Sequence, residues 1–83
     1  MKIRTIIIDD EPLARQRIEG LISHVDEVEV ICQCRNGAEA IEAITKYQPD
    51  LIFLDIQMPG INGFGVLDKI EVLPVVTFVT AYD

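Results

Sequence analysis

Short apolar runs alternate along this 83-residue sequence with segments whose apolar residues recur at helical spacing. The first run, 3–8, is nearly unbroken and rich in β-branched residues, which is typical of a strand buried on both faces of a parallel sheet. Further runs predict strands over 28–34, 51–54 and 75–80, the first of them alternating as an edge strand does. Because hairpin signals are absent, the order predicts an α/β fold, β-α-β-α-β-α-β, with right-handed crossovers.

The intervening segments predict three helices. Pro12 opens the first, where its missing N–H costs nothing, and the helix continues to about Ser23. The apolar residues that predict its inner face recur at helical spacing, at Ala14, Ile18, Leu21, Ile22 and then Val25. We expect Arg15 to lie on the outer side of this helix. Asn36, with Glu39 three residues later, is a capping-box-like start for the second helix, which residues 49–50 close. A third, short helix is marked by the apolar residues Phe64, Leu67 and Ile70.

The charge balance is acidic. Lys and Arg number 7 against 14 Asp and Glu, the net charge is −7, and the basic residues are scattered. Phosphate backbones attract clustered cations, so we expect no nucleic-acid binding by this segment. The apolar opening is too short for a signal peptide or a membrane span, and acidic residues follow at once. We therefore expect a cytoplasmic protein that does not associate with membranes.

The two cysteines, Cys32 and Cys34, would share one face of a predicted strand. Their α-carbons would then lie about 6.5–7 Å apart. That separation is at or beyond the edge of disulfide geometry. We expect two reduced core residues, which suits a reducing cytosol.

Three of the four predicted strands end in residues with chemistry: Asp9 and Asp10, then Asp55, then Thr80. Alone, a strand-terminal Asp is more often a turn or cap residue, and Thr80 an ordinary strand residue. Parallel sheets, however, gather ligands beyond the carboxyl ends of their strands. If strands 3–8 and 51–54 are neighbours, the carboxylates repel one another, and a hard divalent cation relieves that repulsion. The sequence thus predicts a site for Mg²⁺ and a phosphoryl group.

Three motifs carry a family resemblance: IIIDDEP near the start, DLIFLDIQMPGINGFGVL in the middle and VVTFVTAYD at the end. In order and spacing they resemble the receiver domain of two-component response regulators, and the opening IIIDDEPLAR and loop DIQMPGINGF are most similar to receivers that precede LytTR-type DNA-binding domains. The resemblance implies a three-layer, CheY-like and flavodoxin-like parallel sheet with strand order 2-1-3-4. Residues 1–83 would form a partial receiver domain without its last helices and fifth strand.

The resemblance also implies residue roles. Asp55 matches the phosphoacceptor, which would attack the phosphohistidine of a sensor histidine kinase as a nucleophile. Asp10 matches a direct Mg²⁺ ligand beside Asp55, and Asp9 an acidic neighbour that acts through water. Gln57 matches the residue whose backbone carbonyl completes the protein ligands of the metal. Thr80 matches the hydroxyl that contacts the phosphoryl group, while no lysine here matches the phosphoryl-contacting lysine of the fifth strand.

Three function classes follow. The first is a signalling receiver, not an enzyme beyond self-phosphorylation and self-dephosphorylation, that controls an output domain outside this chain. The second is a phosphohydrolase with an Asp nucleophile, although such enzymes usually carry a second Asp where this chain has Gln57. The third is an interaction module that kept the fold and lost the switch. We also expect strand 75–80 to be an open edge, so that the segment self-associates or rearranges, with weak or no stable phosphorylation of the segment alone.

Overall fold

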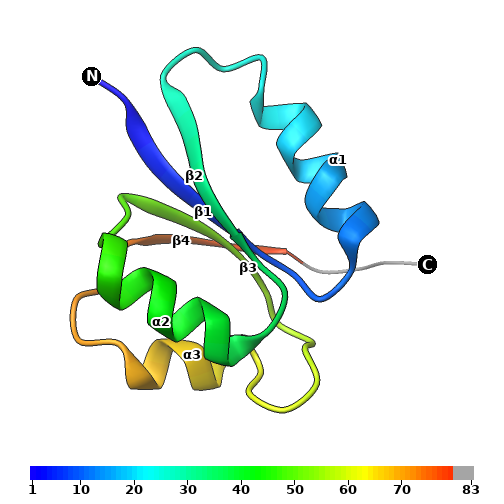
Figure 1. Cartoon of the computed structure of the whole chain (residues 1–83), viewed down its shortest axis with the longest axis vertical. Helices are drawn as coiled ribbons and strands as arrows, with labels where there is room; N and C mark the ends of the chain where they lie inside the picture. Colours follow the sequence, from blue (N-terminus) through cyan, green and yellow to red (C-terminus); the bar gives the residue numbers. More distant parts are fainter. Residues whose placement is uncertain (80–83) are drawn as a thin grey trace.

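The computed structural model describes residues 1–79, which form a single parallel sheet with three helices (Figure 1). In chain order the elements are β1 (Ile3–Ile8), α1 (Pro12–Ile22), β2 (Val28–Cys34), α2 (Gly37–Tyr47), β3 (Leu51–Asp55), α3 (Gly63–Lys69) and β4 (Val75–Val79). The strands lie in the order β2-β1-β3-β4 and all pairs are parallel. The predicted fold class, element order and strand order are therefore confirmed. The predicted end of the last strand, Thr80, lies outside the described residues.

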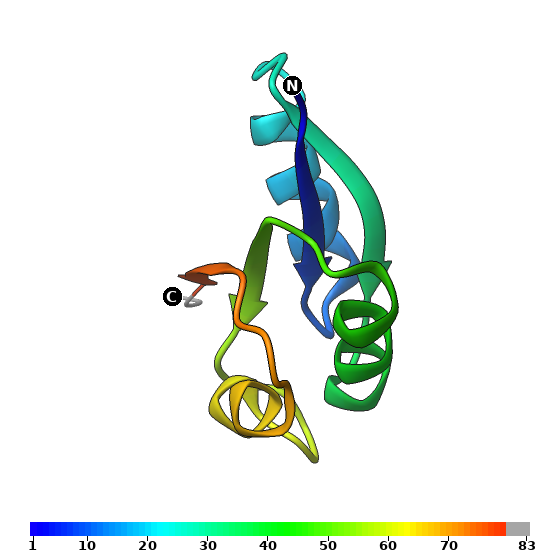
Figure 2. The same ribbon diagram turned by 90° about the vertical axis from the view of Figure 1, so that its left-hand side faces the viewer.

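The helices make two layers, one on each face of the sheet (Figures 1 and 2). Helices α2 and α3 pack against each other on one face, whereas α1 lies over β1 and β2 on the other. This layering follows from the strand order and from the right-handedness of the crossovers. The crossover through α1 runs along the sheet in one direction, from β1 to β2, and those through α2 and α3 run in the other direction, to β3 and β4. Right-handed crossovers that run in opposite directions put their helices on opposite faces of the sheet.

The apolar core lies between the sheet and the α2–α3 layer. Strands β1 and β3 supply fully buried residues from their apolar runs, and α2 and α3 supply the facing side chains. The main members are Ile6, Ile8, Ile52, Leu54, Ala40, Ile44 and Val66. The unbroken run 3–8 thus became a central strand in which residues 5–8 are buried on both faces, as the sequence predicted. In β3 the residues that face the core are buried, and Leu51 and Phe53 are half-buried.

Helix α1 is packed much less tightly than α2. None of its residues is buried, and Leu21 is 69% exposed. The prediction that Leu21 and Val25 belong to its inner face is wrong. The half-buried apolar residues of the helix are the i, i+4 row of Ala14, Ile18 and Ile22. Helix α1 packs mainly on β1 and β2, whereas α2 packs on the same two strands and also on α3, so α1 buries the narrower stripe.

The helix starts show which capping predictions hold. Asn36 caps α2, since its Oδ1 accepts a hydrogen bond from the Glu39 N–H at 2.8 Å. The reciprocal bond of a capping box is shifted by one residue, because the Glu39 carboxylate accepts from the Arg35 N–H at 3.1 Å. Asn62 caps α3 in the same way as Asn36, through the Gly65 N–H at 3.0 Å. Pro12 stands in the first turn of α1, as predicted.

Both cysteines are free thiols, as predicted. Cys34 is buried and Cys32 half-buried, and both belong to β2, the edge strand beside β1. Within residues 1–79 no helix combines the length and apolar character needed to cross a membrane.

Candidate acidic site at the strand ends

The pairing of β1 with β3 brings the acidic residues together. Ile8 stands opposite Leu54 in the parallel register, so the next residues, Asp9 and Asp55, leave the sheet side by side. One carboxylate oxygen from each of Asp9, Asp10 and Asp55 can be chosen so that all three lie within 4.8 Å of one another. The predicted convergence of the three carboxylates is therefore present in the structure.

Asp9 and Asp55 are buried carboxylates, at 4% and 8% exposure, while Asp10 is half-buried. The pKa of Asp55 is raised to about 6, mainly by burial. The hydrogen bond from the Gln57 N–H lowers this pKa, and the nearby Asp9 and Asp10 raise it. The ordinary pKa of an aspartic acid is near 4. The site therefore stabilises the neutral form of Asp55, and a cation placed among the three carboxylates would relieve the same strain.

Two turns of the same type orient the carboxylates. Asp9 Oδ1 accepts a hydrogen bond from the Glu11 N–H at 2.9 Å, and Asp55 Oδ1 accepts one from the Gln57 N–H at 3.0 Å. These are Asx turns, in which the side chain bonds the backbone two residues later. Each turn fixes the direction of its carboxylate at the point where the chain leaves the sheet.

Two arginines of α1 lie near the acids. Arg15 is half-buried, and its Nη1 donates to the Asp9 carbonyl oxygen at 2.7 Å. The predicted outer position of Arg15 is therefore wrong, because a hydrogen bond to the β1–α1 turn holds its guanidinium there. Arg17 lines the cavity that holds Asp9, Asp10 and Asp55. Sequence reasoning missed this contact, and its one signal was that Arg17 follows Ala14 by three residues, on the same helix face.

The cavity above the carboxylates has a volume of about 280 Å³. Gln57 lines it with the acids, as does Val79, which stands opposite Asp55 in the β3–β4 register. Gln57 has an exposed side chain, and its backbone N–H donates to Asp55. Thr80, the predicted phosphoryl-contacting residue, lies outside the described residues.

Gly63 fixes how closely α3 approaches the phosphoacceptor candidate. A Cβ added to Gly63 would lie 2.8 Å from the Asp55 carbonyl oxygen, closer than real side chains come. Its N–H donates to the Ile56 carbonyl oxygen at 3.1 Å, directly beside the strand end. In the same loop Gly60 has a φ of +77°, which favours glycine. The glycines of the loop therefore let the chain turn tightly around the end of β3.

The donor set suits a hard cation. Carboxylate oxygens are the ligands that Mg²⁺ prefers, and it commonly takes one or two of them together with water and phosphate oxygens. The three acids offer such oxygens at the mouth of a cavity, without a nearby histidine or thiol among the grouped residues. The residues present therefore fit Mg²⁺ better than a soft metal ion.

Comparison with known proteins identifies the family. Residues 5–83 match the response regulator receiver domain family. The transcriptional regulatory protein BtsR of Salmonella typhi is 46% identical over 84 residues, which cover 98% of this chain and 35% of BtsR. The chain belongs to the response regulator receiver domain family, and it spans about a third of the length of such relatives.

Solved structures agree on the fold. The signal receiver domain of NarL from Mycobacterium tuberculosis superposes with a TM-score of 0.87 and 33% identity, over 99% of this chain and 68% of that one. CheY in the CheX–CheY–BeF₃–Mg²⁺ complex of Borrelia burgdorferi has a TM-score of 0.86 over 96% of this chain and 63% of that one. At 21% identity the second likeness concerns the fold alone.

Proposed function

We propose that Asp55 is the phosphoacceptor of this receiver domain and that Mg²⁺ is the metal held beside it. The observation that carries the proposal is the convergence of Asp9, Asp10 and Asp55, with oxygens within 4.8 Å of one another at the end of β1 and β3. In the role we assign, Asp10 and Asp55 are direct ligands together with the Gln57 backbone carbonyl. Asp9 acts through water, and Thr80 contacts the phosphoryl group.

The chemistry follows from these positions. A carboxylate oxygen of Asp55 attacks phosphorus, a P–O bond forms, and the P–N bond to a kinase phosphohistidine breaks while the imidazole nitrogen takes up a proton. Mg²⁺ supplies the charge neutralisation that phosphoryl transfer needs. The Gln57 N–H holds one oxygen of Asp55 in place, so the carboxylate is already oriented. With its pKa raised to about 6, Asp55 is still mostly the nucleophilic carboxylate at neutral pH.

We further propose that the partners are a sensor histidine kinase and a C-terminal output domain of a longer parent protein. The support is that BtsR, which shares this segment at 46% identity, is named a transcriptional regulatory protein. A LytTR-type DNA-binding output domain and a cytoplasmic location stay predictions from the sequence. The role is that of a signalling module whose only catalysis concerns its own phosphoryl group.

A phosphodonor experiment tests the assignment. Incubated with acetyl phosphate and Mg²⁺, the whole protein should gain one phosphoryl group, measured by intact-protein mass spectrometry. Asp55→Asn should abolish the gain, and Asp10→Asn should reduce it strongly. Asp68→Asn is the matched control, since Asp68 is an exposed acid of α3. Undiminished labelling of the Asp55 variant would refute the role, and multiple turnover of a phosphoester would favour the phosphohydrolase.

We also propose that residues 1–83 expressed alone self-associate through β4. In the described sheet β4 forms an edge, where Val75 is 68% and Phe78 42% exposed. Phe78 packs on Phe64 at 5.4 Å between ring centroids, which makes an apolar patch beside the edge. Sedimentation should show concentration-dependent association, and Val75→Lys should reduce it by placing a charge on the edge. A compact monomer at all concentrations would contradict this proposal.

A further inference from the structure

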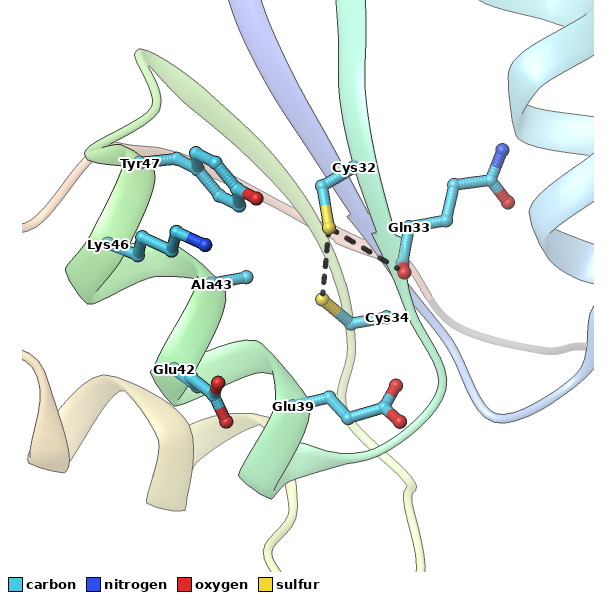
Figure 3. Close-up of a pocket in the computed structure, with 8 residues that line it drawn as sticks. All are labelled: Cys32, Gln33, Cys34, Glu39, Glu42, Ala43, Lys46 and Tyr47. Carbon is cyan, nitrogen blue, oxygen red and sulfur yellow. Dashed lines mark hydrogen bonds between the residues drawn. The ribbon is translucent and has the colours of Figure 1, made fainter.

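A second cavity lies between β2 and α2, away from the acidic site (Figure 3). Its volume is about 340 Å³. Cys32 and Cys34 form the strand side, and their sulfur atoms point toward each other and toward the helix in Figure 3. Glu42, Lys46 and Tyr47 line the helix side. The response regulator chemistry described above uses none of these residues.

The geometry of the thiols resembles half of a metal site. The two sulfur atoms are 4.0 Å apart. Around a tetrahedral Zn²⁺ with bonds of about 2.3 Å, two thiolate sulfurs lie about 3.8 Å apart. The sulfurs therefore need to move by only a few tenths of an ångström to grip one ion, because alternation along a strand already puts residues 32 and 34 on the same face.

A disulfide is the competing fate of neighbouring thiols, and the structure disfavours it. The S–S bond of a disulfide is about 2.05 Å long, and residues two apart on an extended strand have α-carbons at the limit that the bond can bridge. Burial and the neighbouring Cys32 raise the pKa of Cys34 to about 12, so little thiolate is present to start oxidation. The pair is therefore preserved as a reduced dithiol, and a metal ion that binds it has to displace the thiol protons against the raised pKa of Cys34.

We propose that Cys32 and Cys34 bind one soft, thiolate-seeking metal ion of the Zn²⁺ and Cd²⁺ type, as a site separate from the hard-oxygen site of the strand ends. Binding releases two thiol protons to solvent, forms two metal–sulfur bonds and involves no change of oxidation state. The remaining coordination positions face the cavity and are open to water. The helix side of the cavity carries both the Glu42 carboxylate and the Lys46 ammonium group, so the attraction for a metal ion comes from the two thiolates.

Cadmium alone is a suitable probe, because thiolate-to-cadmium charge transfer absorbs in the ultraviolet and oxygen ligands give no such band. Cd²⁺ is titrated into the reduced whole protein with excess Mg²⁺ present, which occupies hard-oxygen sites. The band should grow to saturation at one equivalent per chain, and Zn²⁺ should reverse it by competition. Cys32→Ser should lose the band, as should Cys34→Ala.

The controls separate this site from the proposed phosphoacceptor. Asp10→Asn and Asp55→Asn should keep the full cadmium band, whatever they do to phosphorylation. Cys32 is half-buried on an edge strand, so Cys32→Ser should keep the circular dichroism spectrum and melting temperature of the parent. If Cys34→Ala fails to fold, the cadmium titration of Cys32→Ser alone tests the proposal. Absence of the band in the parent protein would overturn the proposal, as would an equal band in Cys32→Ser.

Discussion

The apolar core and the acidic site lie at adjoining parts of the same sheet and have opposite effects on stability. Between the sheet and the α2–α3 layer, side chains such as Ile44 and Leu54 are almost completely buried among apolar neighbours. At the end of β1 and β3, three carboxylates crowd within 4.8 Å, and one of them has a raised pKa. The first region contributes stability through burial, and the second costs stability through repulsion and desolvation.

This difference shows how a binding site is held in an unfavourable state. Asp9 and Asp55 directly follow two fully buried residues, Ile8 and Leu54, in paired strands. The rigid pairing fixes the carboxylates close together, although their charges would separate them on a mobile loop. Such a site gains most from a ligand that neutralises it, because the strain is already present before the ligand binds.

The largest effect is expected in the core. Ile44→Ala removes a side chain that is 2% exposed and packed between α2 and the sheet. We expect the free energy of unfolding to fall by about 2–5 kcal/mol, since both burial and packing are lost. Urea denaturation followed by circular dichroism measures it. A loss below about 1 kcal/mol would show that the α2 layer is not the tightly packed region that its burial indicates.

The next largest effect is a gain in stability, and we expect it from a substitution in the acidic site. The folded state holds the Asp55 proton more tightly than the unfolded chain does, since the folded pKa is about 6. Stability from this proton is complete below about pH 4 and is lost as the pH rises through about 6. Asp55→Asn should therefore match the parent near pH 4 and exceed its metal-free stability by on the order of 1–2 kcal/mol above pH 7. Thermal melting across that pH range tests this, and a constant difference at all pH values would contradict it.

Magnesium should offset part of the stability that the acidic site costs. At ten times its dissociation constant, an ion that binds only the folded state stabilises it by about 1.4 kcal/mol. That corresponds to a rise of roughly 6–11 °C in melting temperature for a domain of this size. The rise should be absent in Asp10→Asn at the same magnesium concentration and present in Asp68→Asn. An equal rise in all three proteins would mean that the ion acts elsewhere.

The smallest effect is expected on the outer side of α1. Leu21→Ala alters a side chain that is 69% exposed, so the free energy of unfolding should change by less than about 0.5 kcal/mol. The same denaturation experiment as for Ile44→Ala measures it, and the two variants together give the contrast between the layers. A cost comparable to that of Ile44→Ala would show that α1 is held against the sheet as firmly as α2.

Much of this arrangement was predictable from local sequence. The apolar run 3–8 and the run before Asp55 predicted buried central strands, and their acidic ends predicted the carboxylate cluster. The reason is that parallel pairing leaves little freedom at a strand end. The exposure of Leu21 was not predictable, because it depends on which neighbours α1 packs against, and α1 lacks a helix partner of the kind that α2 has in α3. Likewise, the hydrogen bond of Arg15 to the Asp9 carbonyl depends on the three-dimensional path of a turn, which periodicity does not describe.

One backbone hydrogen bond joins the two candidate sites. The Asp9 N–H donates to the Cys34 carbonyl oxygen at 3.0 Å, so the last residue of β2 and the first acid of the cluster share one link. The Asp9 amide proton is consequently a natural spectroscopic reporter. Its own residue carries a carboxylate of the acidic site, and the residue that accepts its hydrogen bond, Cys34, carries a thiol of the second site. In a nitrogen–proton correlation spectrum this single resonance should shift with either ion, and the direction of each shift would tell the two ions apart.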